Sequence, residues 1–240
     1  MRVATALNLL ALDTSSDWCS AALWVDGHTI VRDALAGQRH SELILPMIDA
    51  LLRETGLALR ALDALAFGAG PGSFTGLRIA CGVAQGLALG AGLPVVPVST
   101  LEALAEASGA ARAVAALDAR MGEIYCAAYE REVAGWREVF SPCVCAPAAA
   151  PALEGGGWTG CGSGFAAHAQ ALRARYAGSV DAVSDELLPH ARGIAAVGAR
   201  AAAAGRALDA ALAAPLYLRD KVALSVAERD ARGPAGWTRS

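Results

Sequence analysis

The chain has 240 residues, a length that suits one large domain or two small ones. Hydrophobic residues make up 55% of it but aromatic residues only 5%, so small aliphatic side chains supply the apolar character and a disordered chain is excluded. The 20 basic and 23 acidic residues leave a net charge of −3. This balance argues against a protein that binds nucleic acid by itself through phosphate neutralisation.

The apolar stretches of the chain are too interrupted to span a membrane. Residues 77–98 contain Arg78, Gln85 and Pro94, whereas a spanning helix needs about 20 residues with almost no charge. Asp13 and Asp17 interrupt the apolar run near the N-terminus, so a signal peptide is not expected either. The sequence predicts a cytoplasmic protein that makes no contact with a membrane.

The first third of the chain alternates strand and helix patterns. Apolar runs predict strands at residues 7–12, 19–25 and 29–35, with a hairpin turn at Asp26–Gly27. Apolar residues at intervals of three and four after Ser41 predict a helix. The patterns that follow indicate a strand at 64–69, a glycine loop at 70–75, a helix at 76–91, a strand at 94–98 and a helix at 100–108.

A second unit repeats part of this pattern. Each unit starts with an apolar strand that ends in Asp, at residues 9–13 and 114–118, which indicates an internal duplication and two mixed α/β lobes. Further elements expected here are strands at 123–131 and 138–145, a loop at 147–157, a Gly-rich turn at 158–164, and helices at 165–176 and 191–212. The expected division is a first lobe at 1–108, a second lobe at 109–223 and a flexible tail at 224–240.

The most distinctive local feature is a glycine loop that enters a helix, Gly70 to Arg78 (GPGSFTGLR). Backbone amides at the start of that helix could cradle an anion, with Arg78 adding positive charge. The loop is not a Walker A motif, because the Lys and the final Ser or Thr are missing. A tight turn with a helix cap explains the same residues, and both interpretations stay open.

Gly82, Gly86 and Gly90 recur every four residues along the following helix and leave one of its faces without side chains. Each costs the helix about 1 kcal/mol relative to alanine, so we expect another backbone to approach this face closely. That backbone belongs either to the protein's own sheet or to a partner's helix. The apolar stripe of the helix that starts at Ser41 is likewise either core or interface.

Polar turns follow the first strand of each unit, at residues 13–16 and 118–123. In a duplicated sheet protein such turns face each other across a cleft, where hydroxyls and amides bind phosphates and a carboxylate holds Mg²⁺ through water. Asp and Ser are also ordinary turn formers. A further Gly-rich turn at 160–164 could approach an adenine ring. The candidate residues of the inter-lobe cleft are Asp13, Thr14, Ser15, Asp118, Arg120 and Glu123.

The cysteines and histidines indicate neither a metal site nor a hydrolase. Six cysteines in a chain without an export signal are expected to be free and mostly buried. Cys143 and Cys145 form a C-x-C pair, but neither a second pair nor a nearby histidine completes a zinc site. The four histidines are scattered, and His40 suits a helix cap or an interface better than a general base.

An ordered set of motifs resembles the TsaB (YeaZ) family. These motifs are LALDTSS at 10–16, HSE at 40–42, GPGSFTGLR at 70–78, VAQGLA at 83–88, VSTLEAL at 98–104, LDARMGE at 117–123 and PLYLR at 215–219. The resemblance runs from about residue 7 to residue 223 and is dense over the first 130 residues.

The resemblance implies an actin-like (ASKHA, RNase H-like) α/β fold of two duplicated lobes, each with a mixed sheet flanked by helices. It also implies a non-catalytic dimerisation subunit that is required for threonylcarbamoylation of the tRNA adenosine adjoining the anticodon. Such a subunit pairs with the catalytic paralogue TsaD, helps to recruit the ATPase TsaE, and forms a homodimer when alone. It requires no cofactor itself, since the complex uses ATP and Mg²⁺ through partners, and it meets tRNA mainly through the complex.

The catalytic paralogue carries an H-x-x-x-H metal site after its glycine helix, and this chain departs from that pattern. Thr100 and Leu104 stand where the two histidines would be, and neither side chain can replace an imidazole on a metal. The resemblance therefore implies no metal site and no catalytic residue here.

The same family pairs through the helix after the glycine loop together with the helix that precedes the loop. The partner-interface residues that this implies are His40, Leu43, Ile44, Met47, Leu51, Thr75, Arg78, Ile79, Gly82 and Gly86. The alternative function is an ATP-binding or ATP-hydrolysing ASKHA enzyme that acts on a small substrate at the cleft turns. A third interpretation, a metallopeptidase, fails because the metal ligands are missing from the motif.

Overall fold

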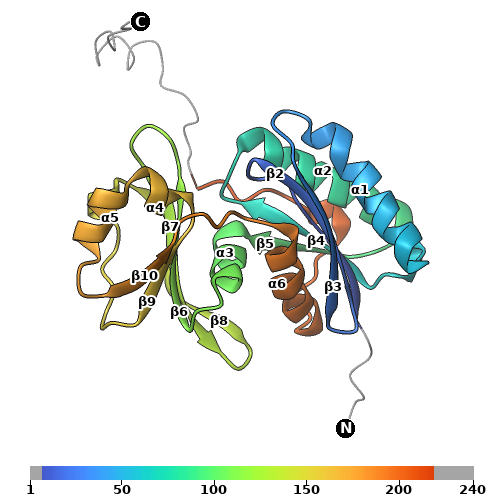
Figure 1. Ribbon diagram of the computed structural model, residues 1–240. Helices are drawn as coiled ribbons and strands as arrows, with labels where there is room; N and C mark the ends of the chain where they lie inside the picture. The colour runs from blue at the N-terminus through green and yellow to red at the C-terminus, as the bar shows by residue number, and fades with distance from the viewer. Residues whose placement is uncertain (1–6, 219–240) are drawn as a thin grey trace, which may run out of the picture.

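Two five-stranded sheets form the framework of the protein, whose computed structural model describes residues 7–218 (Figure 1). β1 to β3 form an antiparallel meander, and β4 and β5 extend the sheet from β1 in parallel. The order is β3-β2-β1-β4-β5, with bounds β1 (Asn8–Asp13), β2 (Trp18–Val25), β3 (His28–Leu35), β4 (Ala64–Gly70) and β5 (Val95–Ser99).

The second sheet repeats this topology strand for strand. β6 to β8 form an antiparallel meander, and β9 and β10 extend the sheet from β6 in parallel. The order is β8-β7-β6-β9-β10, with bounds β6 (Arg112–Asp118), β7 (Ile124–Glu132), β8 (Gly135–Cys145), β9 (Trp158–Cys161) and β10 (Val180–Ser184). The internal duplication expected from the sequence is confirmed, since β1 to β5 correspond to β6 to β10 in order and direction.

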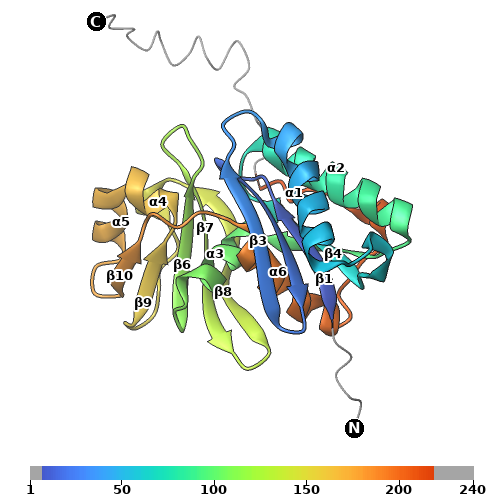
Figure 2. The same ribbon diagram turned by 45° about the vertical axis from the view of Figure 1, so that its right-hand side comes forward.

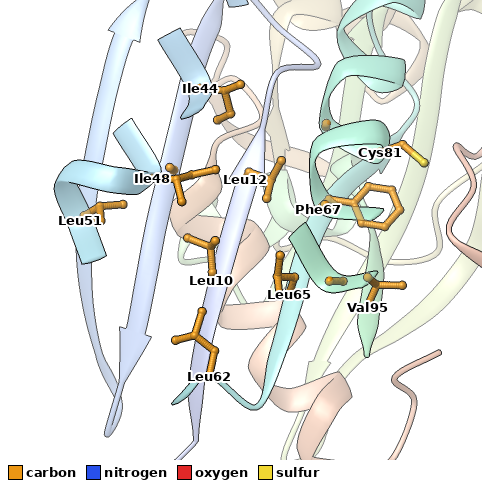
Figure 3. Packing of buried hydrophobic residues seen from close by; sticks show 14 of the residues in the cluster. Leu10, Leu12, Ile44, Ile48, Leu51, Leu62, Leu65, Phe67, Cys81 and Val95 are labelled. Carbon is orange, nitrogen blue, oxygen red and sulfur yellow. The ribbon is translucent and has the colours of Figure 1, made fainter. Parts of the chain in front are cut away.

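Two helices cover the outer face of the first sheet, α1 (His40–Thr55) and α2 (Phe74–Ala91) (Figure 2). α1 packs on β2 and β3, and α2 packs on β4 and β1. Figure 3 shows the core between them and the sheet, where Ile44 of α1 and Cys81 of α2 belong to the same buried cluster as Leu12 and Phe67. Burial of each large aliphatic or aromatic side chain of this kind contributes roughly 1.5–3 kcal/mol.

The corresponding face of the second sheet is covered by two short helices, α4 (Ser163–Ala167) and α5 (Ala169–Arg175) (Figure 1). Their buried residues Phe165 and Leu172 pack with Val114 of β6 and Trp158 of β9. Three short 3-10 turns occur in connecting segments, namely η1 (Leu59–Ala61), η2 (Pro147–Ala149) and η3 (Ala210–Leu212).

Two further helices, α3 (Thr100–Ser108) and α6 (Ala191–Ala203), lie between the sheets and pack against each other (Figures 1 and 2). α3 follows the first sheet but packs on β6 and β7 through Leu101 and Leu104. α6 follows the second sheet but packs on β1, β2 and β4 through Ile194 and Val197. Each of these two helices therefore packs on the sheet that the other half of the chain forms. The two helices change sides, and a division along the chain cannot show such crossovers.

Other elements also differ from the sequence-based expectation. β9 and β10 were not expected, and the helix expected at 165–176 is interrupted at His168, whose φ is −128° and ψ is 35°. The long helix expected at 191–212 ends at Ala203. Leu208 instead pairs with Val95 at the edge of the first sheet. The expected tail at 224–240 lies outside the described residues.

α2 is the one helix among residues 7–218 whose length and composition match a membrane span, with a mean hydropathy of 1.2 over 18 residues. Its buried side chains, including Leu77, Ala84 and Ala88, face the core of the first lobe. Packing on β4 therefore accounts for the apolar character of this helix, as it does for the core helices of many globular proteins.

Glu106 of α3 ties the elements between the two sheets together. Its carboxylate accepts hydrogen bonds from Arg200 of α6 at 2.6 Å, from the indole of Trp136 in β8 at 2.7 Å and from Arg131 of β7 at 3.4 Å. Burial raises the pKa of this carboxyl group, but the hydrogen bonds from Arg200 and Trp136 outweigh burial and hold the pKa below its ordinary value of 4.5.

Replacing Glu106 by Gln is expected to lower the free energy of unfolding at pH 7 by about 1–3 kcal/mol, because two partly buried arginines lose their carboxylate. Since the folded pKa is depressed, this stabilisation is present above pH 4.5 and is lost as the pH falls through the folded pKa. Urea denaturation of both forms at pH 7 and at about pH 3 measures the difference. Equal stabilities at pH 7 would show that the ion pairs contribute nothing.

Candidate functional site

A cleft of about 840 Å³ opens between the two lobes. Three turns line it, namely the β1–β2 turn with Ser15, the glycine loop with Gly72, and the β6–β7 turn with Asp118 and Arg120. The lining also includes His40, Ser163, Leu216 and Tyr217. The two duplicated turns thus meet at one cleft, because β1 and β6 hold equivalent places in their sheets.

Asp13 and Thr14 lie beneath the floor of this cleft and do not line it, since both are fully buried. Ser15 donates its backbone N–H at 3.1 Å and its hydroxyl at 3.0 Å to the Asp13 carboxylate. The hydroxyl of Thr14 donates to the carbonyl of Gly76 at 2.6 Å. The expectation that all three residues of this turn face the cleft is therefore corrected: only Ser15 does.

Burial raises the pKa of Asp13 above its ordinary value of 3.8, and the two hydrogen bonds from Ser15 only partly offset this. The folded state therefore binds a proton more tightly than the unfolded state does. Stability consequently falls as the pH rises from about the unfolded pKa toward the folded pKa.

Replacing Asp13 by Asn is expected to remove this pH dependence, because the amide is never charged and can still bond to Ser15. The free energy of unfolding of the variant should exceed that of the natural chain by more at about pH 8 than at about pH 4. Urea denaturation at the two pH values measures it. A gain that is larger at acid pH would contradict the assignment of a raised pKa.

The glycine loop before α2 is held by close packing on the β1–β2 turn. A Cβ atom on Gly72 would lie 2.7 Å from the carbonyl oxygen of Ser15, and one on Gly76 would overlap the carbonyl oxygen of Thr14. The amide of Ser73 donates to Ser15 at 2.8 Å, and the Ser73 hydroxyl accepts from the amide of Gly76 at 3.3 Å. Packing and helix capping therefore account for these glycines, and two of the amides that could cradle an anion already have partners.

Asp118 is the cleft carboxylate of the second lobe. It accepts from the amide of Arg120 at 2.9 Å and forms an ion pair with the Arg120 guanidinium at 3.2 Å. The imidazole of His168 lies 3.6 Å from the same carboxylate, and the Asp118 amide donates to Ser163 at 3.2 Å. Glu123, which was expected at the cleft, is not among the residues that line it.

The Gly-rich turn at 160–164 packs within the second lobe. A Cβ atom on Gly162 would lie 2.5 Å from the carbonyl oxygen of Ala116, and one on Gly164 would lie 2.8 Å from the Ala116 side chain. A Cβ atom on Gly160 would meet the ring of Phe165 at 2.5 Å. These glycines let α4 approach β6, so packing within the second lobe accounts for them.

The outer sides of α1 and α2 lie next to each other on the surface of the first lobe (Figure 2). Ile44 and Leu51 do not belong to this surface: both are fully buried, and Figure 3 shows them pointing into the core. Their periodicity placed them on the apolar stripe of α1, but they occupy the side that faces the sheet. The remaining expected residues define what we call the α1–α2 face: His40, Leu43, Met47, Thr75, Arg78, Ile79, Gly82 and Gly86.

The glycines of the α1–α2 face have free space beside them. A Cβ atom added to Gly82, Gly86 or Gly90 would meet nothing within 4 Å in the described part of the chain. All three are exposed on the side of α2 that faces away from the sheet. Of the two backbones that could require these glycines, the protein's own sheet is therefore excluded.

Arg78 of this face is held in place by two aromatic rings. Its guanidinium lies 3.9 Å from the centre of the Phe74 ring and donates to the Tyr217 hydroxyl at 3.1 Å. The rings of Phe74 and Tyr217 are 5.6 Å apart, and the amide of Leu216 donates to Ala69 at 2.7 Å. Phe74 and Tyr217 were missed as site residues, although both belong to motifs visible in the sequence.

Comparisons with known proteins assign the family. A family model described as "TsaD: tRNA N6-adenosine threonylcarbamoyltransferase" matches residues 31–225. The TsaB protein of Haemophilus influenzae is 42% identical over 90% of this chain and 95% of its own length, and that of Escherichia coli is 39% identical over 90% and 96%. The solved structure of YeaZ from Pseudomonas aeruginosa matches with a TM-score of 0.81 and 39% identity, covering 88% of this chain and all of that one.

The chain belongs to the TsaB family. Its two duplicated lobes, each a mixed sheet flanked by helices, are the actin-like ASKHA fold that the resemblance to TsaB implied. The relatives named TsaB span almost the whole chain, whereas the transferase model describes the related protein TsaD.

Core residues fill the two positions at which the resemblance would place the paralogue's histidines. Thr100 is fully buried and donates its hydroxyl to the carbonyl of Pro71. Leu104 is fully buried among the residues that join α3 to the second sheet. Neither side chain is placed to hold a metal ion, because one is already bonded and the other is an alkyl group.

A cluster of three cysteines was missed in the sequence. Cys126 of β7 lies next to Cys143 and Cys145 of β8, so the C-x-C pair does have a third thiol beside it. The two strands pair in antiparallel register with Cys126 opposite Cys143. Only the strand register brings these residues together, and spacing along the chain gives no sign of it.

Proposed function

We propose that this chain is the non-catalytic dimerisation subunit in the biosynthesis of threonylcarbamoyladenosine in tRNA. Its relatives from H. influenzae and E. coli are named as biosynthesis proteins for that modified nucleoside, which supports the pathway. The observation that carries the structural role is the open glycine side of the α1–α2 face, an exposed helix surface without side chains. Exposed glycines cost a helix about 1 kcal/mol each, and a partner helix that approaches closely accounts for that cost.

The partner that we propose for the α1–α2 face is a TsaD-type chain, or a second copy of this chain when it is alone. The transferase family model covers residues 31–225, so such a partner has helices equivalent to α1 and α2, and two such pairs can form a small bundle. Gly82 and Gly86 admit the partner's backbone, while Leu43 and Met47 supply apolar area. In this proposal the ATPase TsaE joins the resulting pair.

The proposed role includes no chemistry by this chain. Thr100 and Leu104 offer no metal ligand, so the transfer step belongs to the partner. The chain requires no cofactor of its own, and ATP and Mg²⁺ enter through the partners. The net charge of −3 supports tRNA contact mainly through the partners, and we place the complex in the cytoplasm without membrane contact.

The cleft supports a second candidate, an ATP-binding or ATP-hydrolysing enzyme acting on a small substrate. Its volume of about 840 Å³ suits a nucleotide, and Ser15 and Ser163 line it beside Asp118. Against this candidate, Asp13 is buried below the cleft and Asp118 is already paired with Arg120. The candidate requires Mg²⁺-dependent ATP turnover by the isolated chain that is lost in Asp118→Asn.

Reconstitution separates the two functions. The chain is mixed with TsaD, TsaE, tRNA, ATP and threonylcarbamoyl-adenylate, and the modified adenosine is quantified by mass spectrometry. We expect no modification without this chain and undiminished modification with its Asp118→Asn variant. Loss of modification in a variant that still pairs with TsaD would favour an enzymatic role for the cleft.

A further inference from the structure

Three thiols converge at the edge of the second sheet. The sulfur of Cys126 lies 3.6 Å from that of Cys143 and 3.8 Å from that of Cys145, and all three sulfurs lie within 4.8 Å of one another. The strands place them on one face of the sheet, because Cys143 and Cys145 are two residues apart on β8 and Cys126 is opposite Cys143 on β7. Cys126 is buried and the other two are half-buried, so the cluster is reachable from solvent.

These distances are those of a thiolate metal site. A tetrahedral centre with metal–sulfur bonds of about 2.3 Å holds its sulfurs about 3.8 Å apart. Thiolate ligands select soft or borderline cations such as Zn²⁺, Cd²⁺ and Cu⁺ over Mg²⁺ or Ca²⁺. We propose that Cys126, Cys143 and Cys145 form a three-thiolate site for a thiophilic cation of the Zn²⁺ class.

A buried hydroxyl without a partner points to the same place. Tyr176, which follows α5, is 2% exposed, and its hydroxyl has no hydrogen-bond partner among residues 7–218. It packs in the same core cluster as the three cysteines. An unpaired buried hydroxyl costs about 1–3 kcal/mol, and a metal-bound thiolate would accept its hydrogen bond.

Binding of a metal ion to the three cysteines releases protons. A cysteine is mostly a thiol at pH 7, and the thiolate is the form that binds a metal. Binding of one divalent cation forms three metal–sulfur bonds and releases three protons to solvent. The fourth position of a tetrahedral ion is left to solvent. Because β8 is an edge strand, the bound ion would fasten it to β7.

The first test uses the full reduced chain and Cd²⁺ as the probe. We expect an ultraviolet band from thiolate–Cd²⁺ charge transfer that reaches a plateau at one ion per chain and disappears when Zn²⁺ displaces Cd²⁺. Cys143→Ala should abolish the plateau at one ion per chain, whereas Cys81→Ala, which removes a buried cysteine of α2 far from the cluster, should leave it unchanged. Cys143 is half-buried, so the variant is expected to fold.

A second measurement needs no variant. Stoichiometric Zn²⁺ should protect Cys143 and Cys145, the two half-buried cysteines, from a thiol reagent. It should also raise the melting temperature of the natural chain but not of Cys143→Ala. Tyr176→Phe should keep the site and weaken Cd²⁺ binding by about 10-fold. A band that Cys143→Ala leaves intact would overturn the proposal, as would a reduced natural chain that shows no band.

Discussion

Leucine at both Gly82 and Gly86 is expected to abolish pairing with a TsaD-type chain while leaving this chain folded. Nothing in the described residues lies within 4 Å of a Cβ atom at either exposed position, so leucine can be added there without a clash at the Cβ atom. In the proposed complex, the two leucine side chains would fill the space that the partner's helix occupies. Overpacking costs about 1–3 kcal/mol at each position, so affinity should fall on the order of 100-fold or more. Co-elution by size exclusion and calorimetric titration measure the loss.

The matched control carries two leucines at the same spacing on another exposed helix, Gln170→Leu with Ala174→Leu on α5. It adds the same side chains to the outer surface of the second lobe, away from the α1–α2 face. Pairing should be unchanged in the control and lost in the α2 variant. Undiminished co-elution of the α2 variant with TsaD would exclude the α1–α2 face as the interface.

Alanine at Gly76 is expected to lower the free energy of unfolding by about 1–3 kcal/mol, because its Cβ atom would overlap the carbonyl oxygen of Thr14. The shift required would also strain the hydrogen bond from the Thr14 hydroxyl to the Gly76 carbonyl. Alanine at Gly82, on the same helix, should instead raise the free energy of unfolding by up to about 1 kcal/mol, since its Cβ atom has no neighbour within 4 Å among the described residues.

Urea denaturation of the two variants beside the natural chain measures this contrast in sign. It tests whether two glycines of one helix serve different purposes, one for the chain's own packing and one for a partner. Destabilisation of both variants to the same degree would contradict this distinction.

Hydrophobic periodicity predicted most of the fold. The strands from β1 to β8 follow from apolar runs bounded by turn residues, and the repeated strand ending in Asp indicated the duplication. β9 and β10 were missed because they are short and, in β10, mostly exposed, so neither forms a clear apolar pattern. The exchange of α3 and α6 between the sheets depends on crossovers in space, which local patterns do not contain.

The site was predicted less completely than the fold. The apolar stripe of α1 identified the helix, but only the packed structure separates the partly exposed Leu43 and Met47 from the fully buried Ile44 and Leu51. A polar turn indicated a cleft, yet burial of Asp13 depends on how closely the glycine loop approaches it.

Glycine spacing predicted that a backbone approaches α2, and the structure excludes the chain's own sheet as that backbone. The structure shows free space beside Gly82, Gly86 and Gly90. The sequence could not show this, because it does not tell which side of the helix meets the sheet. Gly72 and Gly76, in contrast, have no room for a side chain, since the β1–β2 turn packs against them.

Hydrogen exchange of this chain with and without a TsaD-type partner tests the central claim most directly. The claim is that the chain acts through its α1–α2 face and not through its cleft. The account predicts slowed amide exchange in peptides from α1 (His40–Thr55) and α2 (Phe74–Ala91), with little change in the β6–β7 turn at Asp118 and Arg120. Slowed exchange confined to the turns that line the cleft, with α1 and α2 unchanged, would contradict it.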